Sequence, residues 1–317
     1  MKLTIVIPAR NEEENIPQTI DELLTAIGES RDMVESYEII VIDDHSTDNT
    51  FAAVSNLDKP GLRAIRLSRR SGSHIAIRAG LAMATGDGVL CISADGQDDA
   101  AMLPQMLRQL REGSNIVWAL RKGRENEPLL QRLFARLFYR LLTRFGSAST
   151  GIDLSRADFY LLDNKVVAAI NTCPERNTSL FGLIAWLGFQ QGWVEYDRKQ
   201  RRTGTSGWNF RSRLRLATDW IIAFSGVPLK LMTISGFLIA GFGFLYALLV
   251  ITRSILFGSP LVGWSSVMTA ILLLGGGQIM MLGIIGEYLW RTLDESRNRP
   301  AYFIEQDSLP LGLHDSC

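Results

Sequence analysis

The residues best suited to chemistry lie in one short run, residues 92–99. Three carboxylates and a carboxamide follow a β-rich run at 88–92 and precede a predicted helix at 101–111, namely Asp95, Gln97, Asp98 and Asp99. Open α/β sheets bind ligands beyond the carboxyl ends of their strands. Hard oxygen donors at this spacing suit Mg²⁺ or Mn²⁺, which usually share their coordination with substrate phosphates. A polar strand-to-helix loop with an aspartate N-cap is the alternative interpretation of this run alone.

The elements that must position this run alternate between strand and helix up to about residue 121. Apolar, β-branched runs predict strands at 3–7, 37–42, 62–67, 89–92 and 115–120. Helices are expected between them, near 13–27, from about 49, at 74–84 and at 101–111. This alternation predicts a mostly parallel, three-layer α/β sheet. The polar loops 8–12 and 43–48 also follow strands, so we expect them to line one crevice with 93–99.

The composition excludes several classes of protein. With 317 residues and a formal net charge of zero, the chain can bury a sizeable core and carries no global signal for nucleic acid. Its three cysteines are far apart and predict neither a disulfide framework nor a zinc site. The first apolar run is too short for a signal peptide. No Gly-x-Gly-x-x-Gly and no Walker A sequence occurs, so a metal and arginines are expected to hold any phosphate ligand.

Three motifs lie at the ends of the first, second and fourth predicted strands: Ile5–Glu13 (IVIPARNEE), Val41–Asp48 (VIDDHSTD) and Ala94–Asp98 (ADGQD). Together they resemble the family 2 glycosyltransferases of GT-A fold, and more narrowly the polyprenyl-phosphate glycosyltransferases related to dolichyl-phosphate mannose synthase. The resemblance runs through nearly the whole chain. It implies that Asp43 and Asp44 bind the nucleotide, and that Asp95 and Gln97 hold Mg²⁺ or Mn²⁺ on the diphosphate. It also implies nucleotide contacts from the neighbouring residues Pro8, Ala9, Asn11, Glu12, Ser93 and Ala94.

The same resemblance implies further roles. Asp158 matches the family's Gly-Asp-Phe-Arg motif and is expected at the acceptor side of the site, where it either orients other groups or acts as a base. Arg121 is expected to bind phosphate, and Asp95, Asp158 and Arg121 are the residues expected to be catalytic. The lipid phosphate is expected to contact Arg132 or Arg136, Arg198, Arg201 and Ser206. The chain departs from the family pattern at four positions: a serine replaces an aspartate at Ser93, aromatic residues replace arginines at Tyr160 and Phe181, and a glycine replaces a lysine at Gly207.

The second half of the chain predicts contact with a membrane. Arginines recur every four residues between apolar residues at 129–146, as in an interfacial helix, and a second interfacial helix is expected at 209–228. The charge-free runs 231–252 and 264–286 are long enough to cross a bilayer. Flanking arginines then place the catalytic domain and both termini in the cytoplasm, and the chain as a multi-pass protein in the bacterial plasma membrane.

The predicted organisation is therefore a catalytic domain at 1–208, a juxtamembrane helix at 209–228, two spans within 229–291 and a tail at 292–317. The expected reaction is inverting transfer of a sugar from a nucleotide sugar, UDP-linked in preference to GDP-linked, to polyprenyl phosphate. The resemblance also implies a homo-oligomer, specifically a tetramer. Two alternatives stay open: a membrane-anchored nucleotide-sugar binder with a decayed site, and a processive polysaccharide synthase.

Overall fold

The computed structural model describes residues 1–122, 152, 156–173, 175, 179–199, 227–257 and 263–308. The chain divides into two compact units. Unit 1 comprises Met1–Leu216 together with Arg299–Cys317, and unit 2 comprises Ala217–Asn298. The C-terminal segment thus belongs to the same unit as the N-terminal motifs.

The five predicted strands are confirmed. They are β1 (Lys2–Ala9), β2 (Ser36–Asp43), β3 (Leu62–Leu67), β4 (Gly88–Cys91) and β5 (Ile116–Arg121). Three further strands were not predicted: β6 (Ala157–Asp163), β7 (Gln191–Tyr196) and β8 (Ile304–Asp307). All eight form one sheet in the order β7-β5-β6-β4-β1-β2-β3-β8. β6 runs antiparallel to β4 and β5, β8 runs antiparallel to β3, and the remaining pairs are parallel.

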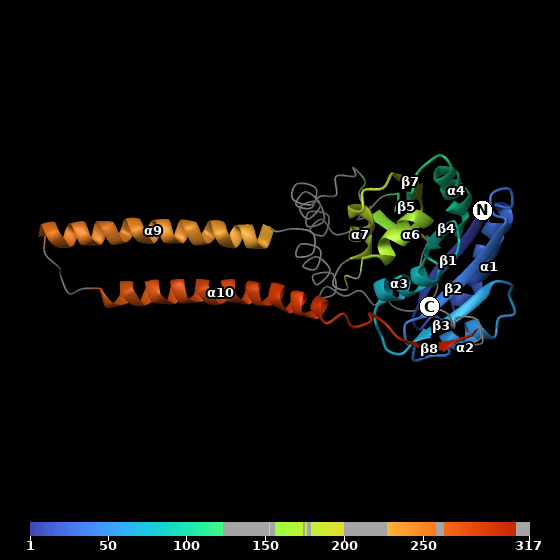
Figure 1. The fold of residues 1–317 in the computed structure, drawn as a ribbon, viewed down its shortest axis with the longest axis horizontal. Helices are drawn as coiled ribbons and strands as arrows, with labels where there is room; N and C mark the ends of the chain where they lie inside the picture. Colours follow the sequence, from blue (N-terminus) through green and yellow to red (C-terminus); the bar gives the residue numbers. More distant parts are fainter. Residues whose placement is uncertain are drawn as a thin grey trace. The chain divides into compact units, whose positions relative to one another are not determined.

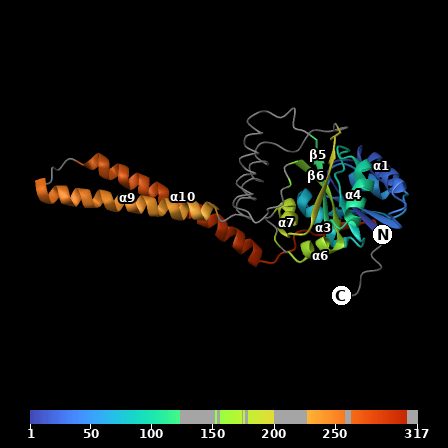
Figure 2. The ribbon, with the colours of Figure 1, turned by 90° about the horizontal axis from the view of Figure 1, so that it is seen from above.

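Helices cover both faces of this sheet (Figures 1 and 2). One face packs against α1 (Ile16–Glu29), η1 (Ala100–Met102) and α4 (Leu103–Arg111), with α2 (Thr50–Ser55) beside α1. The other face carries α3 (Ser73–Met83), α6 (Asn164–Asn171) and α7 (Leu180–Trp186). α1 and α4 each have a proline in their first turn, where its missing N–H costs no helical hydrogen bond.

Alternation along β1 explains why two layers of helices form. Leu3, Ile5 and Ile7 are fully buried on the face that packs against α1 and α4. Val6 points to the opposite face, where a Cβ built on Gly80 of α3 would lie 2.3 Å from its Cγ1 atom. Burying each such side chain contributes about 1.5–3 kcal/mol. A strand that is apolar on both faces therefore sits at the centre of the sheet, with β4 on one side and β2 on the other.

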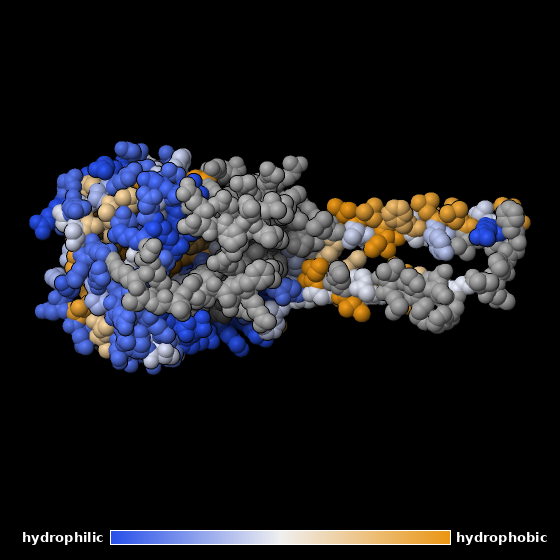
Figure 3. Space-filling model, turned by 180° about the vertical axis from the view of Figure 1, so that it is seen from behind, coloured by the Kyte–Doolittle hydropathy of each residue, from blue (hydrophilic) through white to orange (hydrophobic). Residues whose placement is uncertain are grey.

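Unit 2 contains the helices α9 (Val227–Phe257) and α10 (Trp264–Ser296). Large apolar side chains are exposed on both, for example Phe237, Phe242 and Phe244 of α9 and Ile279 of α10. In the space-filling view the apolar residues of the described surface gather on these two helices, whereas unit 1 is mostly hydrophilic (Figure 3).

The prediction of two membrane spans requires correction. The charge-free runs do lie within α9 and α10, but among the residues that the structure describes no helix is both long and apolar enough to cross a membrane. That finding overturns the predicted two-helix transmembrane domain and the predicted multi-pass location in the bacterial plasma membrane.

Several predicted features lie outside the described residues. They are the interfacial helix at 129–146, nearly all of the helix at 209–228, and the lipid-phosphate candidates Arg132, Arg136, Arg201 and Ser206, together with Gly207.

Candidate functional site

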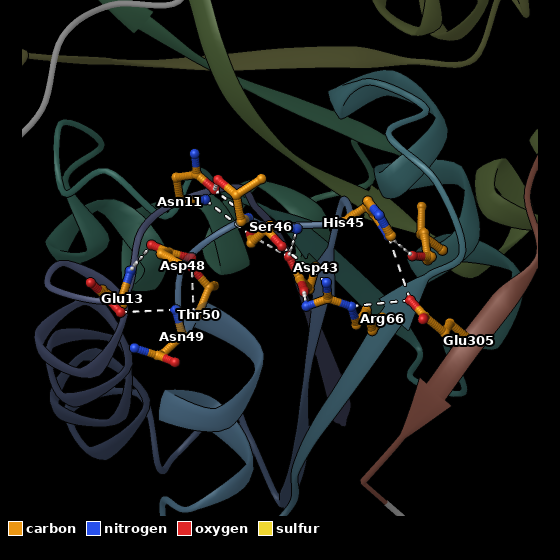
Figure 4. A network of polar contacts seen from close by, with 12 residues as sticks. Asn11, Glu13, Asp43, His45, Ser46, Asp48, Asn49, Thr50, Arg66 and Glu305 are labelled. Carbon is orange, nitrogen blue, oxygen red and sulfur yellow. Dashed lines mark hydrogen bonds and ion pairs between the residues drawn. The ribbon is translucent and has the colours of Figure 1, made fainter.

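The predicted nucleotide residues lie where β1 and β2 end. The two strands are paired in parallel with Ala9 opposite Asp43, so their loops leave the sheet side by side. Asn11 links the loops: its backbone N–H donates to Ser46 Oγ at 3.0 Å, and its Oδ1 accepts from the Thr47 backbone N–H at 2.9 Å. Asn11 and His45 both have φ of 54°, in the left-handed region. Figure 4 shows these contacts, which bring the two predicted loops together.

The neighbouring predicted residues brace this arrangement. The backbone N–H of Glu12 donates to Thr50 Oγ1 at 2.9 Å, and its buried carboxylate accepts from Asn15 Nδ2 at 2.6 Å. Ala9 is buried and Pro8 half-buried in β1. The role of these residues is therefore to hold the loop after β1 in a fixed conformation beside the loop after β2.

The two aspartates at the end of β2 are held by different parts of the protein. Asp43 is buried; its Oδ1 accepts from the backbone N–H and the hydroxyl of Ser46, and its Oδ2 lies 3.0 Å from Arg66 Nη1. Asp44 is also buried and accepts from the backbone N–H groups of Ser71 at 2.6 Å and Gly72 at 2.8 Å. Burial raises the pKa of the Asp44 carboxyl. Both carboxylates thus fix the shape of this edge of the sheet.

The three carboxylates after β4 differ in their burial and in their contacts. Asp95 is half-buried, and its Oδ1 accepts from Ser93 Oγ at 2.8 Å and from the Gln97 backbone N–H at 3.2 Å. Asp98 is buried, and its Oδ2 accepts from the Ser93 N–H at 2.9 Å. Asp99 caps η1 and lies 2.9 Å from Lys199 Nζ. Both of these hydrogen bonds to Asp95 are accepted by one oxygen, Oδ1.

Ser93 and Ala94, both predicted to contact the nucleotide, hold this loop in place. The Ser93 hydroxyl lies between two carboxylates, 2.8 Å from Asp95 Oδ1 and 2.6 Å from Asp98 Oδ2. The carbonyl of the buried Ala94 accepts from Thr19 Oγ1 of α1 at 3.1 Å. Ser93, where the resembling family has an aspartate, therefore serves as a neutral bridge between two acids.

Asp158, at the start of β6, lies at the centre of a second group of contacts. Tyr196 Oη donates to its Oδ2 at 2.6 Å, and Arg121 Nε lies 3.0 Å from the same oxygen. Arg198 Nη1 lies 3.7 Å from its Oδ1. Tyr196 Oη is also 3.3 Å from Asp98 Oδ1, and Arg198 Nη2 donates to Gln97 Oε1 at 2.8 Å. These contacts join Asp158, Arg121 and Arg198 to the loop after β4.

The electrostatics of this group centre on Asp98. Its burial, with Asp158 and Asp95 nearby, raises the pKa of the carboxyl to about 6, while hydrogen bonds from Ser93 oppose the shift. The buried Tyr196 hydroxyl also has a raised pKa, because of burial and the two adjacent carboxylates. Tyr196 therefore remains a neutral hydrogen-bond donor between two acids.

Three further residues, Tyr196, Arg66 and Lys199, contact the predicted site residues and were not predicted from the sequence. Tyr196 ends β7, whose residues alternate between half-buried or exposed and buried, so the alternation of Gln191–Tyr196 was an available signal for a strand. The backbone N–H of Lys199 donates to the Gln97 carbonyl at 3.1 Å, which brings the segment after β7 onto the loop after β4.

Two of the departures from the family pattern turn out to be neighbours. The rings of Tyr160 and Phe181 meet edge to face with centroids 5.2 Å apart, and both contact Trp118, at 5.3 and 5.7 Å. Tyr160 and Trp118 are fully buried. Where the resembling family carries two arginines, this chain has one aromatic cluster, which supplies packing and no phosphate-binding charge.

A divalent ion fits this loop if the substrate supplies most of its ligands. Among the described residues there is no group of three or more His, Cys, Asp or Glu side chains placed to hold a metal. Asp95 and the Gln97 carboxamide supply two oxygen-bearing side chains in one loop. Mg²⁺ commonly binds to one or two carboxylates and takes its other ligands from phosphates and water. The donor set therefore fits an ion that arrives with a diphosphate.

Comparison with known proteins identifies the class. Residues 4–158 match the family model for glycosyl transferase family 2. An uncharacterised glycosyltransferase of Synechocystis is 37% identical over 98% of both chains, and the bactoprenol glucosyl transferase of Shigella phage SfV is 34% identical over 97% of this chain and 99% of its own. The chain belongs to the family 2 glycosyltransferases. It is a glycosyltransferase enzyme with a GT-A-like α/β fold, which sets aside the alternative of a non-catalytic binder.

Among solved structures, mannosyl-3-phosphoglycerate synthase from Rubrobacter xylanophilus is similar over 69% of this chain and 71% of its own, with 20% identity and a TM-score of 0.47. Glucosyl-3-phosphoglycerate synthase from Mycobacterium tuberculosis, solved with Mn²⁺ and UDP, is similar over 68% of this chain and 75% of its own, with 19% identity and a TM-score of 0.45.

Proposed function

We propose that the chain transfers a sugar from a nucleotide diphosphate sugar, UDP-linked in preference to GDP-linked, to polyprenyl phosphate. The observation that carries the proposal is similarity over the full length to bactoprenol glucosyl transferases, at 34% identity and at least 96% coverage of this chain. The carboxylate loops after β1, β2 and β4 support the nucleotide-sugar half of the proposal, since they occupy the carboxyl edge of the parallel strands, where such sheets bind ligands.

In this proposal Asp95 and Gln97 hold Mg²⁺ or Mn²⁺ on the diphosphate. When bound, such an ion offsets the charge that develops on the leaving diphosphate. Arg198 Nη2 donates to Gln97 Oε1 at 2.8 Å, so a guanidinium group orients the carboxamide that would hold the ion. The loops after β1 and β2, tied together by Asn11 and Ser46, hold the nucleoside end of the donor.

Asp158 acts as a positioning residue in this reaction. Its carboxylate is surrounded by Tyr196 at 2.6 Å, Arg121 at 3.0 Å and Arg198 at 3.7 Å, which suits the orientation of two guanidinium groups better than the removal of a proton. A phosphate monoester has a second pKa near 6, so the acceptor is largely ionised at neutral pH and needs no strong base. Attack by its oxygen on the anomeric carbon breaks the bond from that carbon to the diphosphate oxygen and releases the nucleoside diphosphate. One such displacement inverts the configuration of the sugar.

The test is transfer of radiolabel from a panel of UDP- and GDP-sugars to undecaprenyl phosphate in detergent, with Mg²⁺ or Mn²⁺ and with chelator. We expect metal-dependent label in the organic phase, lost in Asp95→Ala. Asp99→Asn is the matched control, because Asp99 lies in the same loop but contacts Lys199 and η1. A long water-soluble polymer would instead favour a processive synthase. Absence of any product from a folded, nucleotide-binding chain would refute the proposal.

A further inference from the structure

The C-terminal strand β8 covers the edge of the sheet next to the loop after β2. β8 pairs antiparallel with β3, with Ile65 opposite Asp307. The pairing is extended on both sides, because the Ser68 N–H donates to the Phe303 carbonyl and the Ser308 N–H donates to the Ala64 carbonyl, both at 2.9 Å. An uncovered β3 would present unpaired backbone groups. β8 is therefore the edge strand of the sheet on the side of β3.

Two acidic side chains of β8 bind two different arginines of β3. Asp307 accepts two hydrogen bonds from Arg63, from Nε at 3.1 Å and Nη2 at 2.6 Å. Glu305 accepts from Arg66 Nε at 3.1 Å. Arg66 also contacts Asp43 and Ser46 at the end of β2 and in the loop after it, whereas Arg63 has its charged partner in β8. The strand therefore carries one contact directed toward the candidate site and one that serves to hold the strand.

Arg66 is fixed along its whole guanidinium group. Nε donates to Glu305, Nη1 donates to Asp43 Oδ2 at 3.0 Å, and Nη2 donates to the Ser46 carbonyl at 3.0 Å. A guanidinium group is planar, so a restraint on its Nε edge sets the direction of the two Nη groups. His45 Nδ1 lies 3.5 Å from the same Glu305 carboxylate. Figure 4 shows this path from β8 through Arg66 to Asp43.

We propose that Glu305 is a positioning residue for the nucleotide sugar, acting through Arg66 on Asp43 and its loop. The inference rests on the proposed function, in which Asp43 lies at the nucleoside end of the donor. Glu305 itself is 42% exposed on its side chain and belongs to a strand with no predicted role. Its contribution is to orient Arg66, which in turn holds the buried Asp43 carboxylate and the Ser46 carbonyl.

The test measures nucleotide affinity by calorimetry, and KM and kcat for the donor sugar, in the full chain. Because the Glu305–Arg66 pair is partly exposed, we expect Glu305→Ala to weaken binding and raise KM about two- to fivefold, with kcat unchanged. Glu305→Gln keeps an oxygen that can accept from Nε and is expected to restore most of the affinity. Asp307→Asn is the matched control, on the same strand but paired with Arg63. It is expected to leave affinity and KM unchanged.

A double-mutant cycle decides whether the effect passes through Arg66. In an Arg66→Met background, Glu305→Ala is expected to have no further effect on affinity. An undiminished effect in that background would overturn the inference, as would equal losses in Glu305→Ala and Asp307→Asn, which would mean that β8 acts only by holding the sheet. If the parent chain binds UDP or GDP but Glu305→Ala changes nothing, this inference alone fails. If the parent chain binds neither nucleotide, the proposed function fails and the inference falls with it.

Discussion

Replacing Asp98 by asparagine is expected to stabilise the protein at neutral pH. The reason is that the hydroxyl groups around the buried carboxylate have fewer protons to donate than there are carboxylate oxygens in contact with them. The Ser93 hydroxyl lies within 2.8 Å of both Asp95 and Asp98, and the Tyr196 hydroxyl lies 2.6 Å from Asp158 and 3.3 Å from Asp98. Two hydroxyl protons cannot satisfy four contacts between oxygens. An asparagine would accept from Ser93 with its oxygen and donate to Tyr196 with its nitrogen, which leaves the tyrosine proton for Asp158.

The magnitude follows from the pKa of Asp98, which is about 6 in the folded chain against an ordinary value of 3.8. In the unfolded chain the carboxyl loses its proton near pH 4, whereas in the folded chain it keeps the proton until about pH 6. The stabilising contribution of the protonated carboxyl is therefore complete below pH 3.8 and is lost as the pH rises through about 6. A shift of about two units at about 1.4 kcal/mol each corresponds to a loss of about 3 kcal/mol.

The assay is urea unfolding of Asp98→Asn and the parent from pH 4 to pH 8, in chelator so that no divalent ion adds charge to the loop. The variant is expected to lack the fall in unfolding free energy between pH 4 and pH 6. Part of the loss of about 3 kcal/mol is already present at pH 4, so the variant should be about 2.4 kcal/mol more stable relative to the parent at pH 7 than at pH 4. Asp99→Asn is the control, because it leaves Asp98, Ser93 and Tyr196 in place, and it should keep the fall between pH 4 and pH 6. A parent-like pH dependence in Asp98→Asn would refute the reasoning.

Three further outcomes follow from the same contacts. Tyr196→Phe removes a hydrogen bond to the carboxylate of Asp158 and is expected to lower the unfolding free energy by about 1.5–3 kcal/mol, measured in urea, and to lower kcat through the loosened arginine pair. Ser93→Asp places a third carboxylate against Asp95 and Asp98; in chelator it should destabilise the chain by about 1–3 kcal/mol, and Mn²⁺ should raise its Tm more than that of the parent. A parent-like response to Mn²⁺ would argue against a metal at Asp95. Burial raises the pKa of the Cys91 thiol to about 12, so in a chain with Cys173 and Cys317 replaced by serine, Cys91 should react with a disulfide reagent only after unfolding.

The central sheet was predictable because its strands are buried on both faces. β1, β2 and β4 have almost continuous apolar sequences, and this is the pattern from which a parallel strand can be read. β8 has the sequence Ile-Glu-Gln-Asp and exposes three of its four residues, so its sequence carries no burial pattern. Its pairing depends on backbone bonds and on arginines of β3 that are more than two hundred positions away in the chain. No local signal marks such a strand.

The motifs of the candidate site could be predicted from the sequence, but the contacts between side chains of distant strands could not. The carboxylates after β2 and β4 stand out because polar residues directly follow apolar strands. Tyr196 and Glu305 look like ordinary strand residues in the sequence. They become part of the site only because β7 and β8 lie at the two ends of the sheet order, from which their side chains reach Asp158 and Arg66. The prediction of membrane spans rested on the length of the charge-free runs. It was wrong because none of the described helices is both long and apolar enough to cross a membrane.

Two similar ion pairs, each between an aspartate and an arginine, lie near the candidate site. Asp43 is paired with Arg66, and Asp158 with Arg121, each at 3.0 Å and each with a neighbouring hydroxyl that also donates to the acid. Removing an acid from such a pair takes a close counter-charge away from an arginine in a partly desolvated place, which costs stability in addition to any loss of function. An inactive alanine variant at either aspartate is therefore ambiguous by itself. The informative comparison is between the asparagine variant and the variant of its arginine partner, because a positioning role predicts that the two lose activity to a similar extent and that the double variant loses little more.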